Sequence, residues 1–140
     1  MSLWKKQTPP TPRRNLPEAP VAYPSGTVVY TSLGHYLINK DGKKYRITSR
    51  AVLDSWSFPL VLETTEAAIA KYPLAVTKLG FRDGTLLTNI ADGRMYVVSE
   101  GTLRHVTSPA VLDRLNVTNS DFKVVSDAEI NLMRLGEEIY

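Results

Sequence analysis

The two histidines and the lack of cysteine decide which metal chemistry the sequence can support. His35 and His105 lie far apart, and neither has neighbours at the short spacing that zinc sites use. Because none of the 140 residues is cysteine, the chain offers neither a thiolate metal site nor a disulfide framework. The sequence therefore predicts no metal site and no cofactor.

Serine and carboxylate side chains are the remaining candidates for catalysis. No serine stands in the Gly-x-Ser-x-Gly elbow of hydrolases, and Ser49, Ser108 and Ser126 are placed where helix N-caps are typical. Asp54 and Asp113 could act as a carboxylate pair, but they recur at matching positions of a repeated pattern, which favours a structural role. We expect no catalytic residues and no enzymatic activity.

Basic residues in short predicted strands could instead bind an anionic polymer. Alternation along the strand directs Lys44 and Arg46 outward, where charge commonly protects a sheet edge. The alternative is contact with a cell-wall or other anionic polymer, which would weaken as salt rises. The residues in question are Lys43, Lys44, Arg46 and Arg104.

An internal repeat indicates how these residues are positioned. Residues 48–54 recur at 107–113 with six of the seven residues identical. Trp56 aligns with Leu115, which predicts a core position for the indole and not a sugar-stacking one. Further matches pair residues 26–29 with 84–87, 36–38 with 96–98, and 65–67 with 126–128. The sequence thus predicts two tandem copies, residues 26–80 and 81–140.

Each copy has the pattern of three short strands, a short helix, a brief strand and a second helix. Turns at Asp41-Gly42 and Glu100-Gly101 are typical of hairpins. A capping box at Ser126–Glu129 begins the last helix, with Ile130, Met133 and Leu135 on its apolar face and Gly136 as its left-handed end. Tyr72-Pro73 is expected to end the equivalent helix of the first copy. The predicted class is α+β: two pseudo-symmetric repeats, each an antiparallel hairpin or meander with two short helices, packed as one body.

An extended arm, residues 1–25, precedes the repeats. It holds six of the nine prolines, four basic residues and one acidic residue, so it carries the whole formal charge of +3. Proline prevents helix and central strand, which favours a polyproline-like segment. The arm is either a disordered tail or a strap that orders along a partner. In the second case the binding residues are Leu3, Trp4, Lys5, Lys6, Arg13, Arg14, Leu16 and Tyr23.

The sequence predicts neither insertion into a membrane nor a nucleic-acid partner. No signal-peptide pattern and no apolar run of about 20 residues is present, so synthesis in a host cytoplasm without membrane insertion is predicted. Nucleic acid is not expected as a partner, because residues 26–140 carry no net charge.

Written as a motif, the repeat reads Gly-Thr-Leu, Tyr-Val-Val, a turn glycine, a basic strand, Ser-x-x-x-Leu and Val-Ser-Asp-Ala-Glu. It resembles a short repeat of bacterial envelope-associated proteins and of minor tail and virion proteins of actinobacterial phages. The resemblance implies a non-enzymatic structural protein of a phage virion: a minor tail, decoration or connector-associated component. Its partners would be other virion proteins, and copies of itself through assembly symmetry. The alternative is a cell-wall or anionic-polymer binding module.

Overall fold

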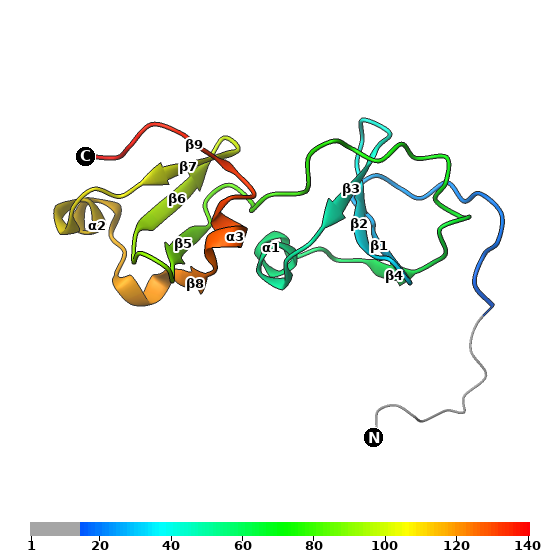
Figure 1. Ribbon diagram of the computed structural model, residues 1–140, viewed down its shortest axis with the longest axis horizontal. Helices are drawn as coiled ribbons and strands as arrows, with labels where there is room; N and C mark the ends of the chain where they lie inside the picture. Colours follow the sequence, from blue (N-terminus) through cyan, green and yellow to red (C-terminus); the bar gives the residue numbers. More distant parts are fainter. Residues whose placement is uncertain (1–14) are drawn as a thin grey trace, which may run out of the picture.

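The computed structural model describes residues 15–140, in which two β-sheets follow one another along the long axis of the molecule (Figure 1). The N-terminal lobe, residues 26–80, is built on a four-stranded sheet. The C-terminal lobe, residues 81–140, is built on a five-stranded sheet. Three short α-helices complete a mixed α+β fold, which confirms the predicted class.

The N-terminal lobe has the strand order β3-β2-β1-β4. The pairs β1–β2 and β2–β3 are antiparallel, whereas β4 runs parallel to β1. Beyond β3, Lys44 forms an isolated parallel bridge with Leu74. The elements are β1 (Val28–Thr31), β2 (Gly34–Ile38), β3 (Lys44–Ile47), α1 (Arg50–Trp56) and β4 (Val61–Glu63).

The C-terminal lobe has the strand order β8-β5-β6-β7-β9. The pairs β5–β6 and β6–β7 are antiparallel, and β8 and β9 run parallel to β5 and β7. A 3-10 turn, η1 (Asn119–Asp121), precedes β8. The remaining elements are β5 (Leu86–Asn89), β6 (Met95–Ser99), β7 (Thr102–His105), α2 (Pro109–Leu115), β8 (Lys123–Val125), α3 (Asp127–Ile130) and β9 (Arg134–Leu135).

The strand that follows the first helix of each lobe differs from the sequence prediction. A hairpin or meander has only antiparallel neighbours, but β4 and β8 pair in parallel with β1 and β5. A helical crossover, α1 or α2, separates each of them from the meander, and such a connection allows the chain to return in the same direction. The antiparallel part of the prediction covers only the first three strands of each lobe.

Local signals explain the positions of the helices. Ser49 is extended (φ −134°) and its hydroxyl oxygen accepts the Val52 N–H, so α1 starts where a serine N-cap predicts. At α3 both bonds of the capping box form between Ser126 and Glu129. Ser108 occupies the N-cap position of α2, but its side chain makes no capping hydrogen bond.

The predicted second helices are only partly present. In the N-terminal lobe residues 65–70 form successive turns and no α-helix. Each turn is closed by a hydrogen bond between residues three apart, such as Ala68 N–H to Thr65 O at 3.1 Å. In the C-terminal lobe α3 ends at Ile130, so Met133 lies outside it and Leu135 lies in β9. Gly136 is not among the residues with positive φ. The second helix is therefore absent from the N-terminal lobe and only four residues long in the C-terminal lobe.

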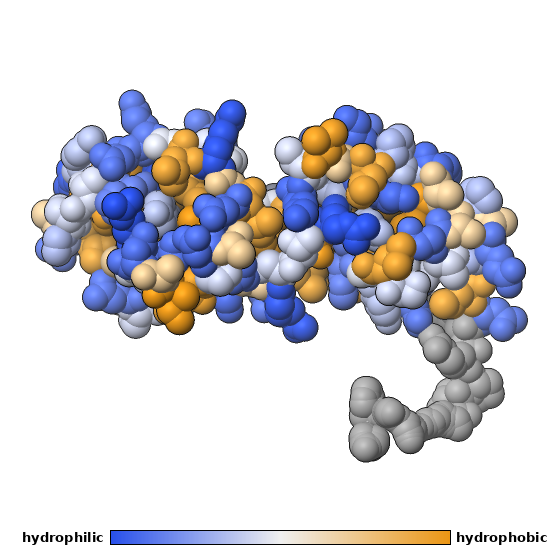
Figure 2. Space-filling view, viewed as in Figure 1, coloured by the Kyte–Doolittle hydropathy of each residue, from blue (hydrophilic) through white to orange (hydrophobic). Residues whose placement is uncertain are grey.

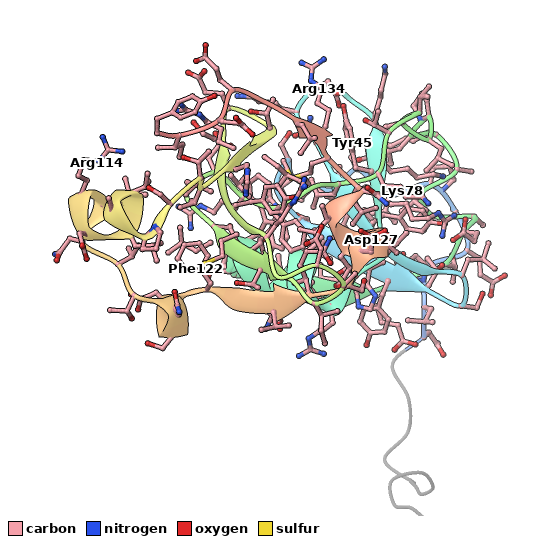
Figure 3. The ribbon with its side chains drawn as sticks, turned by 60° about the vertical axis from the view of Figure 1, so that its left-hand side comes forward. Tyr45, Lys78, Arg114, Phe122, Asp127 and Arg134 are labelled. Atoms are coloured by element: carbon pink, nitrogen blue, oxygen red, sulfur yellow. The ribbon has the colours of Figure 1, made fainter. Side chains whose placement is uncertain are left out.

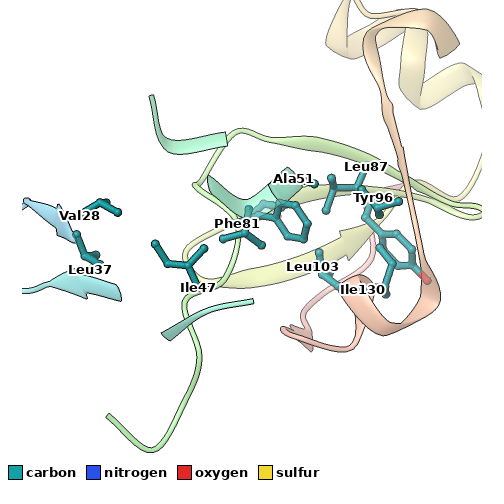
Figure 4. Packing of buried hydrophobic residues seen from close by; sticks show 12 residues of the cluster. Val28, Leu37, Ile47, Ala51, Phe81, Leu87, Tyr96, Leu103 and Ile130 are labelled. Atoms are coloured by element: carbon teal, nitrogen blue, oxygen red, sulfur yellow. The ribbon is translucent and has the colours of Figure 1, made fainter. Parts of the chain in front are cut away.

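One apolar core crosses the boundary between the lobes. It joins Val28 and Leu37 of the N-terminal sheet to Leu87 and Tyr96 of the C-terminal sheet, and Phe81 lies near its middle (Figure 4). A smaller cluster on the N-terminal lobe contains Val29, Tyr36, Ile38 and Ile69. The lobes therefore share most of their buried apolar residues. No helix formed by residues 15–140 is long and apolar enough to cross a membrane.

Candidate interaction surfaces

The described part of the arm is fastened to the N-terminal lobe. The Thr65 hydroxyl donates to Pro17 O at 2.5 Å, and Val21 N–H donates to Ala68 O at 3.0 Å. Tyr23 packs against the smaller core cluster, and its hydroxyl donates to Thr64 Oγ1 at 2.7 Å. Residues 15–25 thus belong to the folded body.

Most of the predicted arm contacts lie outside the described residues: Leu3, Trp4, Lys5, Lys6, Arg13 and Arg14. Of the remaining two, Leu16 is half-buried and lines a small pocket of about 410 Å³ with Tyr30 and Glu66. Tyr23 is engaged with its own chain through its hydroxyl and also through its N–H, which donates to the Tyr72 hydroxyl at 2.8 Å.

The basic strand residues are also held by their own lobe. Lys44 and Arg46 both lie over the Tyr36 ring, at 5.6 Å and 4.7 Å from its centroid. Lys44 Nζ donates to Ile69 O at 3.2 Å, and the Arg46 guanidinium donates to Leu33 O at 3.1 Å and to the Tyr36 hydroxyl at 2.8 Å. The structure thus brings Lys44 and Arg46 together on one face of the sheet.

The Tyr36 hydroxyl under these two cations has a raised pKa. Burial is the largest cause, and the negative charge of Glu66 adds to it, while Arg46 acts in the opposite direction. The phenol therefore stays protonated and serves as a hydrogen-bond partner for Arg46.

The other two predicted cations lie apart from this pair. Arg104 is in the C-terminal lobe, where its Nε donates to Glu137 O at 2.9 Å. Lys43 is exposed in the β2–β3 turn, and its backbone N–H donates to Asp41 Oδ1 at 2.9 Å. The four residues do not form a single patch, since they are divided between two sheets.

The residues considered for catalysis have structural contacts. His35 stacks on Tyr30, with ring centroids 5.3 Å apart, and His105 Nδ1 lies 3.4 Å from Glu138 Oε2. Asp54 pairs with Arg50 on the exposed side of α1 at 3.0 Å. Within residues 15–140 no group of three or more histidine, aspartate or glutamate side chains is placed to hold a metal ion.

The contact between α1 and α3 joins the lobes (Figure 1). The Ser49 hydroxyl, which caps α1, donates to the Glu129 carboxylate of α3. Trp56 Nε1 donates to Gly80 O at 2.8 Å, and Arg82 N–H donates to Ser55 Oγ at 3.2 Å. The predicted core role of Trp56 holds in part: its half-buried indole packs against the shared core, whereas Leu115, with which it aligns, is 41% exposed.

Glu129 is held in its ionised form at this junction. The Ser126 N–H donates to Glu129 Oε1 at 2.9 Å, and this bond is the largest cause that lowers the pKa of the Glu129 carboxyl. The hydrogen bond from Ser49 lowers the pKa further. A carboxylate that accepts several hydrogen bonds is stabilised in its charged form.

A groove of about 900 Å³ lies beside the junction and takes residues from both lobes. Figure 2 shows a notch between the lobes at the upper edge of the view. Apolar side chains of Trp56, Phe81, Leu132 and Met133 line the groove together with the cations Lys78, Arg82 and Arg134. We call it the interlobe groove. These cations could not be predicted from the sequence because they stand in no common motif; only the packing of the lobes brings them together.

A second pocket of about 600 Å³ lies at the outer end of the C-terminal lobe, beside α2. Its lining mixes apolar side chains such as Leu112 with the polar residues Arg94, His105 and Ser108. Two of its charged residues are already paired, Arg94 with Asp92 at 3.8 Å and His105 with Glu138 at 3.4 Å. The interlobe groove is therefore the larger of the two and the one whose cations have no ion-pair partner among residues 15–140.

Comparison with known proteins found no match: no protein-family model, no curated protein and no solved structure is similar to this chain.

Proposed function

We propose that this chain is a non-enzymatic structural protein of a phage virion, attached to neighbouring subunits by the start of its arm. One observation carries the proposal. The hydrogen bonds of Pro17, Val21 and Tyr23 fasten residues 15–25 to the N-terminal lobe, so the arm begins at a fixed point on the folded body. The sequence ahead of that point holds Trp4 and all four basic residues of the arm. A segment that orders only on binding can cover a large partner surface with few residues.

We further propose that the two lobes are diverged tandem copies. The support is the common strand order, in which two antiparallel pairs are followed by a parallel strand after a helix. The backbone hydrogen bonds that the end of each lobe makes to β3 and to β7 also correspond. Leu79 N–H donates to Arg46 O at 2.9 Å, and Ile139 N–H donates to His105 O at 2.9 Å. Copies within one chain suit a protein whose partners are themselves repeated in a symmetric particle.

The state of the strand cations favours this proposal over polymer binding. Lys44, Arg46 and Arg104 each donate to a backbone carbonyl of their own lobe. Binding a polymer through them would break or weaken those hydrogen bonds, which lowers the net gain from each ionic contact. The structural role requires no such exchange.

A competition between two forms of the protein tests the proposal. Full-length chain and a variant lacking residues 1–14 are produced together in cells that assemble the particles, and their ratio is measured in purified particles. The deletion ends at residue 14 because residues 15–25 stabilise the N-terminal lobe. We expect the truncated form to melt like the full-length chain and to be excluded from particles. Equal incorporation of the two forms would refute attachment by the arm.

A further inference from the structure

Three cations of the interlobe groove have no acidic partner in the described part of the chain. Lys78 from the N-terminal lobe and Arg134 from β9 are both exposed (Figure 3), as is Arg82. The ion pairs among residues 15–140 involve none of these three side chains. Asp83 is the single acidic residue among those that line the groove, and its Oδ1 already accepts the Gly101 N–H at 3.0 Å. The rim is therefore positively charged.

The base of the groove is apolar and adaptable. Leu132 and Met133 are half-buried there and pack against the shared core. Met133 lies so close to residues 78–82, the linker between the lobes, that a Cβ on Gly80 would be 2.9 Å from its Cγ. Methionine has a flexible thioether side chain that adjusts to different apolar partners. An apolar side chain of a partner can therefore be accommodated between the cations.

The aromatic residues of the groove offer little surface for stacking with nucleic-acid bases. Phe81 is only 2% exposed. One face of the Trp56 indole is covered by Phe58, whose ring centroid lies 5.9 Å away, and the indole N–H is used by Gly80 O. Single-stranded nucleic acids are bound by aromatic side chains with free ring faces in a long basic channel. The groove therefore fits a peptide better than a nucleic acid.

We infer that the interlobe groove binds an acidic peptide segment of a partner protein, with an apolar side chain on Leu132 and Met133 and carboxylates beside Lys78, Arg82 and Arg134. Charge complementarity across such an interface directs partner choice and accelerates association. The buried apolar contact limits the release of the partner. This inference does not depend on the virion proposal, since it concerns a different surface from residues 1–14.

Fluorescence anisotropy with a defined probe tests the inference on the full-length chain. The probe is a fluorescein-labelled peptide of alternating Asp and Glu with one central leucine, titrated at about 0.15 M salt. We expect the double variant K78E/R134E to bind it at least about tenfold more weakly, with an unchanged melting temperature. Replacing the leucine of the peptide by serine should also weaken binding, because the contact with Met133 is lost.

The matched control separates the groove from the arm, which is also basic. The variant K5E/K6E makes the same change in net charge, and its binding of the peptide should remain within about twofold of the unmodified chain. Equal loss in both variants, or loss in K5E/K6E alone, would overturn the inference. It would also be overturned if the peptide does not bind, or if an oligothymidylate binds at Lys78 and Arg134 while the peptide does not.

Discussion

Glu129 connects the cap of one helix to the cap of another. Its carboxylate accepts from the Ser126 N–H at 2.9 Å and from the Ser126 hydroxyl at 3.1 Å, and it also accepts from Ser49 of the other lobe. Hydrogen bonds to an ionised acceptor are stronger than those between neutral groups. The charge on this one residue therefore contributes both to α3 and to the junction.

The first prediction concerns the charge on Glu129. The variant E129Q should lower the free energy of unfolding by about 1 kcal/mol near neutral pH, because the charge-assisted bonds are weakened. The pKa of this carboxyl is lowered in the folded state from its ordinary value of 4.5. Its contribution is therefore complete above that value and is lost as the pH falls through the folded-state pKa.

Urea unfolding of both proteins across acidic and neutral pH measures this effect. The difference in stability between the unmodified chain and E129Q should shrink as the pH falls below 4.5, the ordinary pKa of the carboxyl. E137Q, which neutralises an exposed carboxylate in the C-terminal segment, serves as the control and should change little at any pH. A difference that is independent of pH would contradict the assigned role of the charge.

At the scale of elements, α1 and α2 each follow a serine of the repeated sequence segment, but only the first serine makes a capping hydrogen bond. Ser49 accepts the Val52 N–H at 3.2 Å and donates to Glu129, whereas Ser108 is exposed and makes no capping hydrogen bond. The difference follows from position: α1 lies at the junction of the lobes, and α2 lies at the outer end of the C-terminal lobe (Figure 1).

The second prediction uses this pair as its own control. S49A should cost about 1–2 kcal/mol of stability, since it removes an N-cap and a contact between the lobes. S108A should change the stability by less than about 0.5 kcal/mol. Chemical denaturation of the two variants under the same conditions measures both values. Equal costs would show that neither the cap nor the contact between the lobes at Ser49 contributes to stability.

Short elements with local signals could be predicted from the sequence, whereas those that depend on a partner element could not. The turn between β6 and β7 was predicted correctly. Glu100 and Gly101 both adopt positive φ, as tight hairpin turns require. The prediction of a second helix in the N-terminal lobe was wrong. Its sequence has Ala68 where α3 has Glu129, so the reciprocal capping bond cannot form. Residues 66–71 then remain in turns.

Sites formed by the packing of the two lobes were beyond a sequence prediction. Lys78, Arg82 and Arg134 converge because the linker and β9 meet beside the α1–α3 contact, and no spacing in the chain encodes that. The predicted cations were Lys43, Lys44, Arg46 and Arg104, and strand alternation placed Lys44 and Arg46 among them on the outer face. Alternation gives the face of a side chain but not the carbonyl that it reaches, such as Ile69 O for Lys44.

At the scale of the whole molecule, the shared core joins the two lobes, and we expect them to unfold as one cooperative unit. Phe81 is 2% exposed and contributes to the cluster that joins both sheets. The third prediction is that F81A lowers stability by about 3–5 kcal/mol and does so for both lobes together. Amide hydrogen exchange in β2 and β6 measures the two lobes separately.

V76A is the control for this experiment, because Val76 is fully exposed at 101% and its truncation should leave exchange unchanged in both sheets. Loss of protection in β6 alone, with β2 unaffected, would show two independent domains. Two independent domains would also change the deletion experiment, because the melting of the chain without residues 1–14 would then have to be compared lobe by lobe.

The central claim is that the chain works as part of an assembled particle, and sedimentation of a host lysate tests it most directly. After density-gradient separation, the protein is quantified in each fraction beside a major particle protein. Association predicts that the two comigrate at a constant ratio through the particle peak and through a second gradient. Recovery of the protein only in the slowly sedimenting fractions, with intact particles free of it, would contradict the claim.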